Sequence, residues 1–122
     1  MEKIKFEKRS QLIKWISEQK DFNIVDVSNN SFEIKCSNFS CLTINHKKGD
    51  SVNQIIEIII ETIDNYSIDD DFNTFLEYAT TEMQPFPYTP SEFMRALMSD
   101  EQTLRELAKE LREIVTKQNI NH

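Results

Sequence analysis

Apolar residues recur along this chain with two different periods, and each period predicts a different kind of element. After Ser10, a favourable N-cap residue, the apolar positions in residues 12–16 follow near-helical spacing. This pattern predicts a first helix that begins near Ser10 and ends before Asp21. The stretch KIKFE ahead of it alternates polar and apolar residues, which is compatible with a short strand.

Three short segments then favour strands. They cover residues 22–27, 31–36 and 41–45, and the middle one alternates cleanly, with Phe32, Ile34 and Cys36 on one face. The sequences SNNS and SNFS between them are typical of turns, because Asn and Ser hydrogen-bond their own backbone. We therefore predict an antiparallel meander with one face covered by helices.

The helical period returns after Gly49, the only glycine in the chain. Ser51 and Gln54 form a capping box and predict the start of a long helix. Its apolar stripe is wide enough to contact both the sheet and another helix. The stripe consists of Val52, Ile55, Ile56, Ile59 and Ile63, with Ile58 and Ile60 beside it.

A second helix is predicted over residues 69–81, where Phe72, Phe75, Leu76 and Ala79 face inward. The stretch MQPFPYTP ends it, because proline cannot continue a helix. Thr89 as N-cap, Pro90 and Glu92 predict a new start. The further capping box over residues 99–102 marks either a break or the interior of one longer helix, and the apolar stripe from Leu104 to Val115 completes the chain.

The order of elements predicts the α+β class, with an N-terminal helix, a small three-stranded antiparallel sheet and a helical C-terminal half. The 122 residues suit one domain, 1–122. Its charge is uneven, although the net charge is −7. Residues 1–48 carry nine Lys or Arg against six Asp or Glu. Residues 49–94 carry ten Asp or Glu and no Lys or Arg, and residues 95–122 carry five of each.

Several functional classes fit this composition poorly. The charged N-terminus has no apolar run, so we expect neither a signal peptide nor a membrane span, and we expect a cytoplasmic protein in a bacterial host cell. Cys36 and Cys41 are then expected to be reduced thiols in the interior of the sheet. A net negative charge argues against generic binding to DNA, because phosphate contacts need cations.

Motifs for catalysis or for a cofactor are missing as well. Asp69, Asp70 and Asp71 are consecutive and no Gly follows, which does not fit a Ca²⁺ loop. The two cysteines, His46 and His122 match no zinc spacing. We therefore expect no metal, no cofactor and no enzymatic activity. A nuclease-like loop NHKKGD that uses His46 is a weaker alternative to a solvated turn.

The acidic block is the most informative feature of the sequence. Its carboxylates lie on two predicted helices and can imitate the phosphates of a nucleic acid toward a basic protein groove, or can simply keep the surface soluble. The Pro-flanked rings of Phe86 and Tyr88 either form a binding hot spot or fill a gap between helices. The candidate contact residues are Glu57, Glu61, Asp64, Asp69, Asp70, Asp71, Glu77, Glu82, Phe86 and Tyr88.

The order of segments over residues 51–115 adds a resemblance. An Ile-rich helix, the acidic stretch IDDDFNTFLEYA, a Pro-containing link and TPSEFMRALMSDEQTLRELAKELREI follow one another. This order resembles a segment in small proteins of phages and conjugative elements of Gram-positive bacteria, some of which resemble anti-CRISPR proteins against type II (Cas9) systems.

The resemblance implies an inhibitor that binds Cas9, or Cas9 with its guide RNA, through the acidic helices. Cas9 offers positively charged nucleic-acid channels to such a protein. The basic residues 1–48 are then candidates for a separate contact with guide RNA. The alternative is an accessory protein of a mobile element that binds a protein partner through its helices and has no Cas target.

Overall fold

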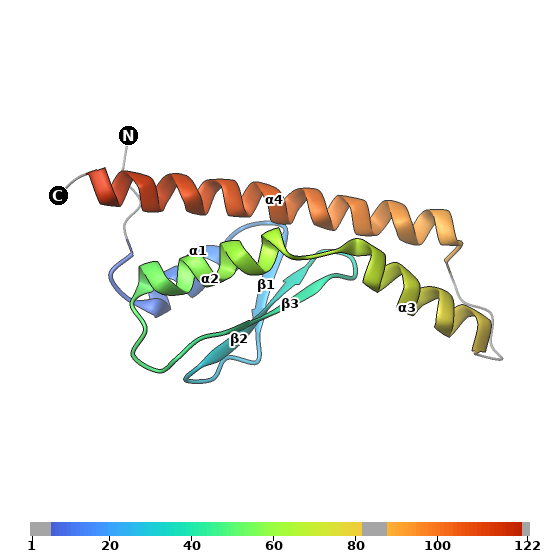
Figure 1. The fold of residues 1–122 in the computed structure, drawn as a ribbon, viewed down its shortest axis with the longest axis horizontal. Coiled ribbons are helices and arrows are strands. Elements are labelled where there is room, and N and C mark those ends of the chain that lie inside the picture. Colours follow the sequence, from blue (N-terminus) through green and yellow to red (C-terminus); the bar gives the residue numbers. More distant parts are fainter. Residues whose placement is uncertain (1–5, 82–87, 121–122) are drawn as a thin grey trace.

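The chain folds as an α+β domain, as the sequence predicts. The computed structural model describes residues 6–81 and 88–120, without the side chains of 78–81 and 117–120. The elements are α1 (Arg9–Ser17), β1 (Phe22–Val25), β2 (Ser31–Cys36), β3 (Cys41–Asn45), α2 (Val52–Asp64), α3 (Ile68–Thr81) and α4 (Pro90–Ile120). Figure 1 shows α4 running along the whole length of the molecule, with α2 and α3 following one another beside it. The alternation in KIKFE falls largely outside the described residues.

The three strands form an antiparallel sheet in the order β1-β2-β3. Phe32 lies opposite Ile44 and Ile34 opposite Leu42, and all four side chains are buried under the helices. The same alternation turns Cys41 outward, so our expectation that it lies inside the sheet is wrong. β1 ends at Val25, two residues earlier than predicted, because Asp26 adopts a left-handed backbone conformation with φ 51°.

Helix α1 begins one residue before the predicted cap Ser10. Lys8 is its N-cap residue, and the Gln11 side chain accepts hydrogen bonds from the backbone N–H groups of Glu7 and Lys8. Arg9 fixes this start to the sheet, because its guanidinium donates to the carbonyls of Ser28 and Ser31.

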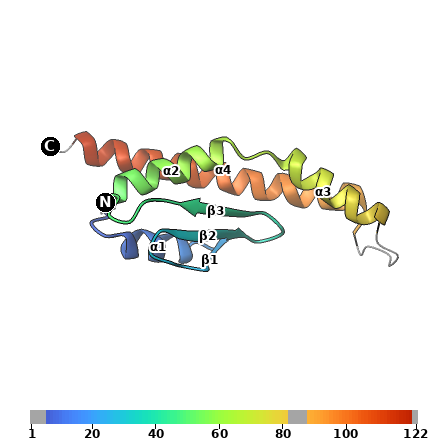
Figure 2. The same cartoon turned by 60° about the horizontal axis from the view of Figure 1, so that its bottom comes forward.

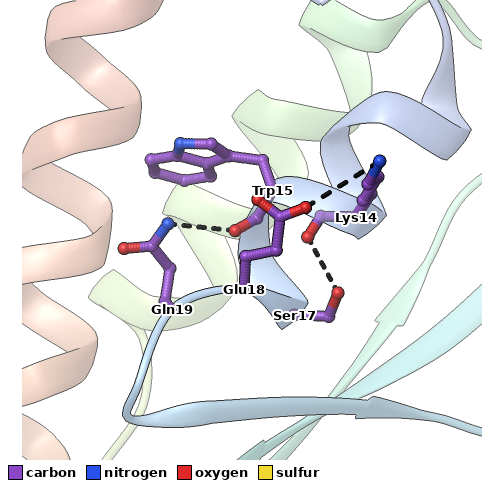
Figure 3. Close-up of polar contacts among 5 residues, drawn as sticks. All are labelled: Lys14, Trp15, Ser17, Glu18 and Gln19. Atoms are coloured by element: carbon purple, nitrogen blue, oxygen red, sulfur yellow. Dashed lines mark hydrogen bonds and ion pairs between the residues drawn. The ribbon is translucent and has the colours of Figure 1, made fainter.

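The end of α1 is closed by its own side chains (Figure 3). Ser17 Oγ donates to the Lys14 carbonyl at 2.8 Å, and Gln19 Nε2 donates to the Trp15 carbonyl at 3.0 Å. Glu18 pairs loosely with Lys14 at 4.0 Å. The Gln19 contact supplies a donor to the Trp15 carbonyl in the last turn, whereas the Lys14 carbonyl also accepts from the Glu18 N–H at 3.0 Å.

Helix α2 starts as predicted. Ser51 is the N-cap residue, its Oγ accepts from the Gln54 N–H, and the Gln54 side chain accepts from the Ser51 N–H. Gly49, with φ 93°, supplies the turn before this cap, a conformation that few other residues adopt without strain. The buried side of α2 consists of Ile55, Ile56, Ile59 and Ile63.

Helix α4 is continuous over 31 residues, so the capping box over residues 99–102 lies inside one helix. The predicted cap at its start is confirmed. The Thr89 N–H donates to the Glu92 carboxylate, the Glu92 N–H donates to Thr89 Oγ1, and both distances are 3.2 Å. Hydrogen bonding to Thr89 lowers the pKa of Glu92.

Helix α4 contributes side chains to two separate hydrophobic clusters. The larger one joins α1, the sheet, α2 and the C-terminal part of α4, and we call this region the body. The smaller one consists of Phe75 from α3 with Phe93 and Leu97 from α4. Figures 1 and 2 both show α3 continuing past the end of the sheet along the N-terminal part of α4. We call α3 with residues 90–100 the arm.

Candidate functional site

Helix α2 presents a row of carboxylates along its exposed side. Glu57, Glu61 and Asp64 are four and three residues apart and all three are exposed. Neither α2 nor α3 contains a Lys or Arg. The row has a cation from another element, however, because Arg112 of α4 forms a close ion pair with Asp64. Glu57 and Glu61, which lie closer to the start of α2 than Asp64, supply the rest of the negative charge in this row.

Helix α3 begins with the three consecutive aspartates, and the structure gives them different environments. Ser67 Oγ accepts a hydrogen bond from the Asp69 N–H at 3.2 Å, in the manner of an N-cap. Asp69 and Asp70 are exposed in the first turn, where the helix dipole favours negative charge. Asp71 is half-buried and accepts a hydrogen bond from the Tyr66 hydroxyl at 2.5 Å.

The exposed carboxylates of the two helices define the surface that we call the acidic face. Glu77, farther along α3, is also exposed. The acidic face comprises Glu57, Glu61, Asp64, Asp69, Asp70 and Glu77, and Asp71 lies partly beneath it. The predicted contact residues Glu82 and Phe86 lie outside the described residues.

Tyr88, the remaining predicted contact residue, belongs to an aromatic group at the start of α4. Its ring lies edge-on to that of Phe39, with 5.2 Å between the ring centroids. The ring centroids of Phe39 and Phe93 are 4.6 Å apart. Phe39 is 41% and Tyr88 43% exposed, so the two rings are only partly covered. They border an open hollow of about 500 Å³, which is also lined by Asn38, Glu92 and Arg95. We call Phe39, Tyr88 and this hollow the aromatic patch.

Phe39 is held in place by a carboxylate that is buried in the middle of α4. Asp100 is 2% exposed. Its two oxygens accept hydrogen bonds from the backbone N–H groups of Asn38, Phe39 and Ser40 and from Asn38 Nδ2, at 2.9 to 3.3 Å. All four donors belong to the turn between β2 and β3. Asp100 therefore fastens that turn to α4.

The same turn is joined to α2 and α3 through Tyr66. Ser40 Oγ and Tyr66 Oη lie 2.5 Å apart, and the Tyr66 hydroxyl donates to Asp71. Because Tyr66 has one hydroxyl hydrogen, Ser40 is the donor in the first of these contacts. Burial, followed by the hydrogen bond to Asp71, raises the pKa of Tyr66.

Sequence reasoning did not identify Asp100, Ser40 or Tyr66 as important. The signal that could have found Asp100 is its place in the helix. It lies between Leu97 and Leu104 at spacings of three and four residues, in the stripe that is otherwise apolar. A carboxylate at a buried position needs hydrogen-bond donors, and the Asn- and Ser-rich turn SNFS provides them.

Other groups that could support chemistry are poorly placed for it. His46 is buried, its Nδ1 lies 3.0 Å from the Lys47 carbonyl, and its ring packs near Phe32. A general base needs access to substrate, which a buried ring lacks. Burial, more than the nearby Asp100 charge, raises the pKa of the Cys36 thiol to about 12, which keeps it unreactive. Among the described residues, no three metal-ligating side chains gather at one point.

No protein family, curated protein or solved structure matches this chain. The site therefore has to be interpreted from its own geometry. Within residues 6–81 and 88–120, no helix has both the length and the apolar character needed to cross a membrane. The arrangement can do two things chemically. It can offer carboxylates to a basic surface, and it can offer partly exposed aromatic rings to an apolar one.

Proposed function

We propose that this chain is an anti-CRISPR protein that inhibits a type II Cas9 by stoichiometric binding, with the acidic face on a nucleic-acid-binding surface of Cas9. The observation that carries the proposal is the set of exposed carboxylates on two successive helices without a Lys or Arg. Cas9 holds its guide–target duplex in a positively charged channel. An acidic protein in that channel would exclude the nucleic acid.

The spacing of the carboxylates supports this mode of binding. Residues four apart rise about 6 Å along an α-helix axis, whereas a DNA strand carries one phosphate per about 3.4 Å of its helix axis. The row from Glu57 to Asp64 is thus less than twofold sparser than a nucleic-acid strand. Lys and Arg side chains that bind phosphates can reach carboxylates at this spacing, because both groups accept the same charge-assisted hydrogen bonds.

The first test is direct binding of the purified protein to Cas9, with and without guide RNA, at low and high salt. We expect tight binding at low salt that weakens as salt rises, because exposed charges are screened. Guide RNA that competes with the protein would place the contact in a nucleic-acid channel. Guide RNA that strengthens binding would instead favour the complex as the target, with a contact by the basic residues 1–48. No binding in either form would contradict the proposal.

Two matched double variants sharpen this test. Glu57→Lys with Glu61→Lys should weaken binding by on the order of 100-fold, because two attractive contacts become repulsive. Glu106→Lys with Glu110→Lys makes the same change in net charge, with the same four-residue spacing, on the exposed side of α4. This control pair should bind Cas9 almost as the unchanged protein does. Equal losses in both variants would mean that net charge, and not the acidic face, determines binding.

The aromatic patch favours a second candidate function, an accessory protein of a phage or conjugative element that binds a protein partner without a Cas target. Partly exposed aromatic rings beside a hollow are typical of binding hot spots. This candidate predicts binding that resists salt and is lost in Phe39→Ala. The double reversal on α2 would then leave binding intact.

A further inference from the structure

The position of α3 depends on few apolar contacts. Within the described part of the chain, its hydrophobic cluster with α4 contains three buried side chains, those of Phe75, Phe93 and Leu97, and the partly buried Ile68 and Phe72 pack against them. The connection from α2 to α3 is only residues 65–67. An isolated helix of 14 residues is marginal in water, so α3 needs further contacts to hold one orientation.

A chain of polar contacts supplies them at the base of the arm. Asp71 of α3 accepts from Tyr66, Tyr66 accepts from Ser40, and the Ser40 N–H donates to Asp100 of α4 at 2.9 Å. Tyr66 and Asp71 are partly buried, and Ser40 and Asp100 are each 2% exposed. Hydrogen bonds in such surroundings are costly to leave unmade, so the chain favours one arrangement of its parts.

We propose that these four residues form a latch that fixes the orientation of α3 relative to α2 and the sheet. Tyr66 and Asp71 are then positioning residues, which keep the carboxylates of both helices in one acidic face. The three consecutive aspartates thereby divide their roles. Asp69 and Asp70 face solvent and are open to a partner, whereas Asp71 turns inward to hold the helix.

The consequence for binding rests on the function proposed above. A partner that contacts both α2 and α3 binds more tightly when the two rows of carboxylates are already in place, because no orientation has to be selected on binding. A protein with an open latch keeps every exposed charge of the acidic face and still binds more weakly.

The latch can be tested without any partner. Tyr66→Phe removes the hydroxyl and keeps the ring. We expect amide hydrogen exchange in α3 to rise about tenfold, which corresponds to the loss of a hydrogen bond to a charged group, with exchange in β2 and β3 unchanged. Thr62→Val is the matched control, because its hydroxyl donates to the Ile58 carbonyl within α2. Unchanged exchange in α3, or an equal rise in α3 and the sheet, would overturn the latch.

The distance between α3 and the sheet provides a second readout. A change confined to the surroundings of Tyr66 would leave this distance unaltered. Spin labels on the exposed positions Thr43 of β3 and Asn73 of α3, with both native cysteines replaced, report the orientation of the arm. We expect one narrow distance distribution for the unchanged latch and a broad one for Tyr66→Phe. The same narrow distribution in both proteins would contradict the proposal.

Substitutions of Asp71 separate positioning from charge. Asp71→Asn keeps an oxygen that can accept from Tyr66, whereas Asp71→Ala removes it. If Asp71 acts through the latch, Asp71→Asn should preserve both the narrow distance distribution and Cas9 binding, and Asp71→Ala should impair both. Equal impairment of Cas9 binding by Asn and Ala, with the distance preserved in both, would make Asp71 a contact residue. If the unchanged protein does not bind Cas9, the proposed function fails, and the distance and exchange data still decide the latch.

Discussion

The body and the arm of this molecule are built from different kinds of contact. The body buries a large cluster rich in Ile and Leu that joins four parts of the chain. The arm buries Phe75, Phe93 and Leu97, with Phe75 and Phe93 stacked at 4.3 Å. Each fully buried apolar side chain contributes about 1.5–3 kcal/mol. The larger cluster has sixteen buried residues and the smaller one has three, so the arm depends more on its attachment to the body.

This difference explains where the polar contacts of the interior lie. Asp100 and Ser40 are two of the few buried polar side chains among the described residues, and both lie where the arm meets the body. Hydrogen bonds depend strongly on direction, unlike apolar contacts, so they can set the angle between two parts. The acidic face crosses this junction, with one half on α2 in the body and the other on α3 in the arm.

The largest effect that we expect comes from cutting the attachment at Asp100. Asp100→Ala leaves three backbone N–H groups of the β2–β3 turn without their acceptor, two of them partly buried and that of Ser40 buried, which should lower the free energy of unfolding by about 3 kcal/mol. Urea unfolding followed by circular dichroism measures this loss. Glu101→Ala is the control, because its side chain is partly exposed and pairs with the exposed Arg105 at 3.8 Å. That variant should change stability by less than about 0.5 kcal/mol. A loss of similar size in both variants would refute the assigned role of Asp100.

The capping boxes at the starts of α2 and α4 allow a smaller and more direct comparison of body and arm. Ser51→Ala and Thr89→Ala each remove one cap, which costs about 1 kcal/mol. For Ser51, in the body, the cost should appear as a lower global unfolding midpoint. For Thr89, which caps the arm's part of α4, it should appear mainly as faster hydrogen exchange in the first turn of α4. Equal shifts of the global midpoint would show that body and arm unfold as one unit.

The smallest effect that we expect is a loss of stability in mild alkali. Burial raises the pKa of Cys36 from 9.0 to about 12, so above about pH 9 the unfolded chain releases this proton while the folded protein retains it. The free energy of unfolding should therefore fall as pH rises from 8.5 to 9.5, by less than about 1 kcal/mol, because Cys36 is only partly covered. Cys36→Ala should flatten this dependence more than Cys41→Ala, whose thiol is exposed. The same slope in both variants would exclude Cys36 as its source.

Local signals in the sequence predict most of the fold. The strands over residues 31–36 and 41–45 and the caps at Ser51 and Thr89 lie where alternation and capping boxes place them. These features depend on residues within about four positions of one another, so a single sequence is enough to recognise them. The N-cap of α1 is Lys8, two residues before the predicted Ser10, because Gln11 and the contact of Arg9 with the β1–β2 turn decide it.

The contacts that organise the candidate site were not predictable in the same way. Asp100 and its donors lie about 60 residues apart in the sequence, and Asp64 and Arg112 are 48 residues apart. Their pairing depends on how α4 packs across the sheet and α2. The sequence places ten carboxylates in one block, whereas the fold assigns Asp64 to an ion pair and Asp71 to Tyr66.

Because α4 is one continuous helix, it fixes the angle between the two hydrophobic clusters around its axis as well as the distance between them. Leu97 of the arm and Leu104 of the body are seven residues apart, close to two full turns, so both lie on the same side of the helix. Each residue of an α-helix advances the phase by about 100°. One residue inserted between them would therefore swing the arm by about a quarter of a turn, and would carry the charges of α3 away from those of α2. The helical phase over these seven residues is thus part of the shape that a partner meets.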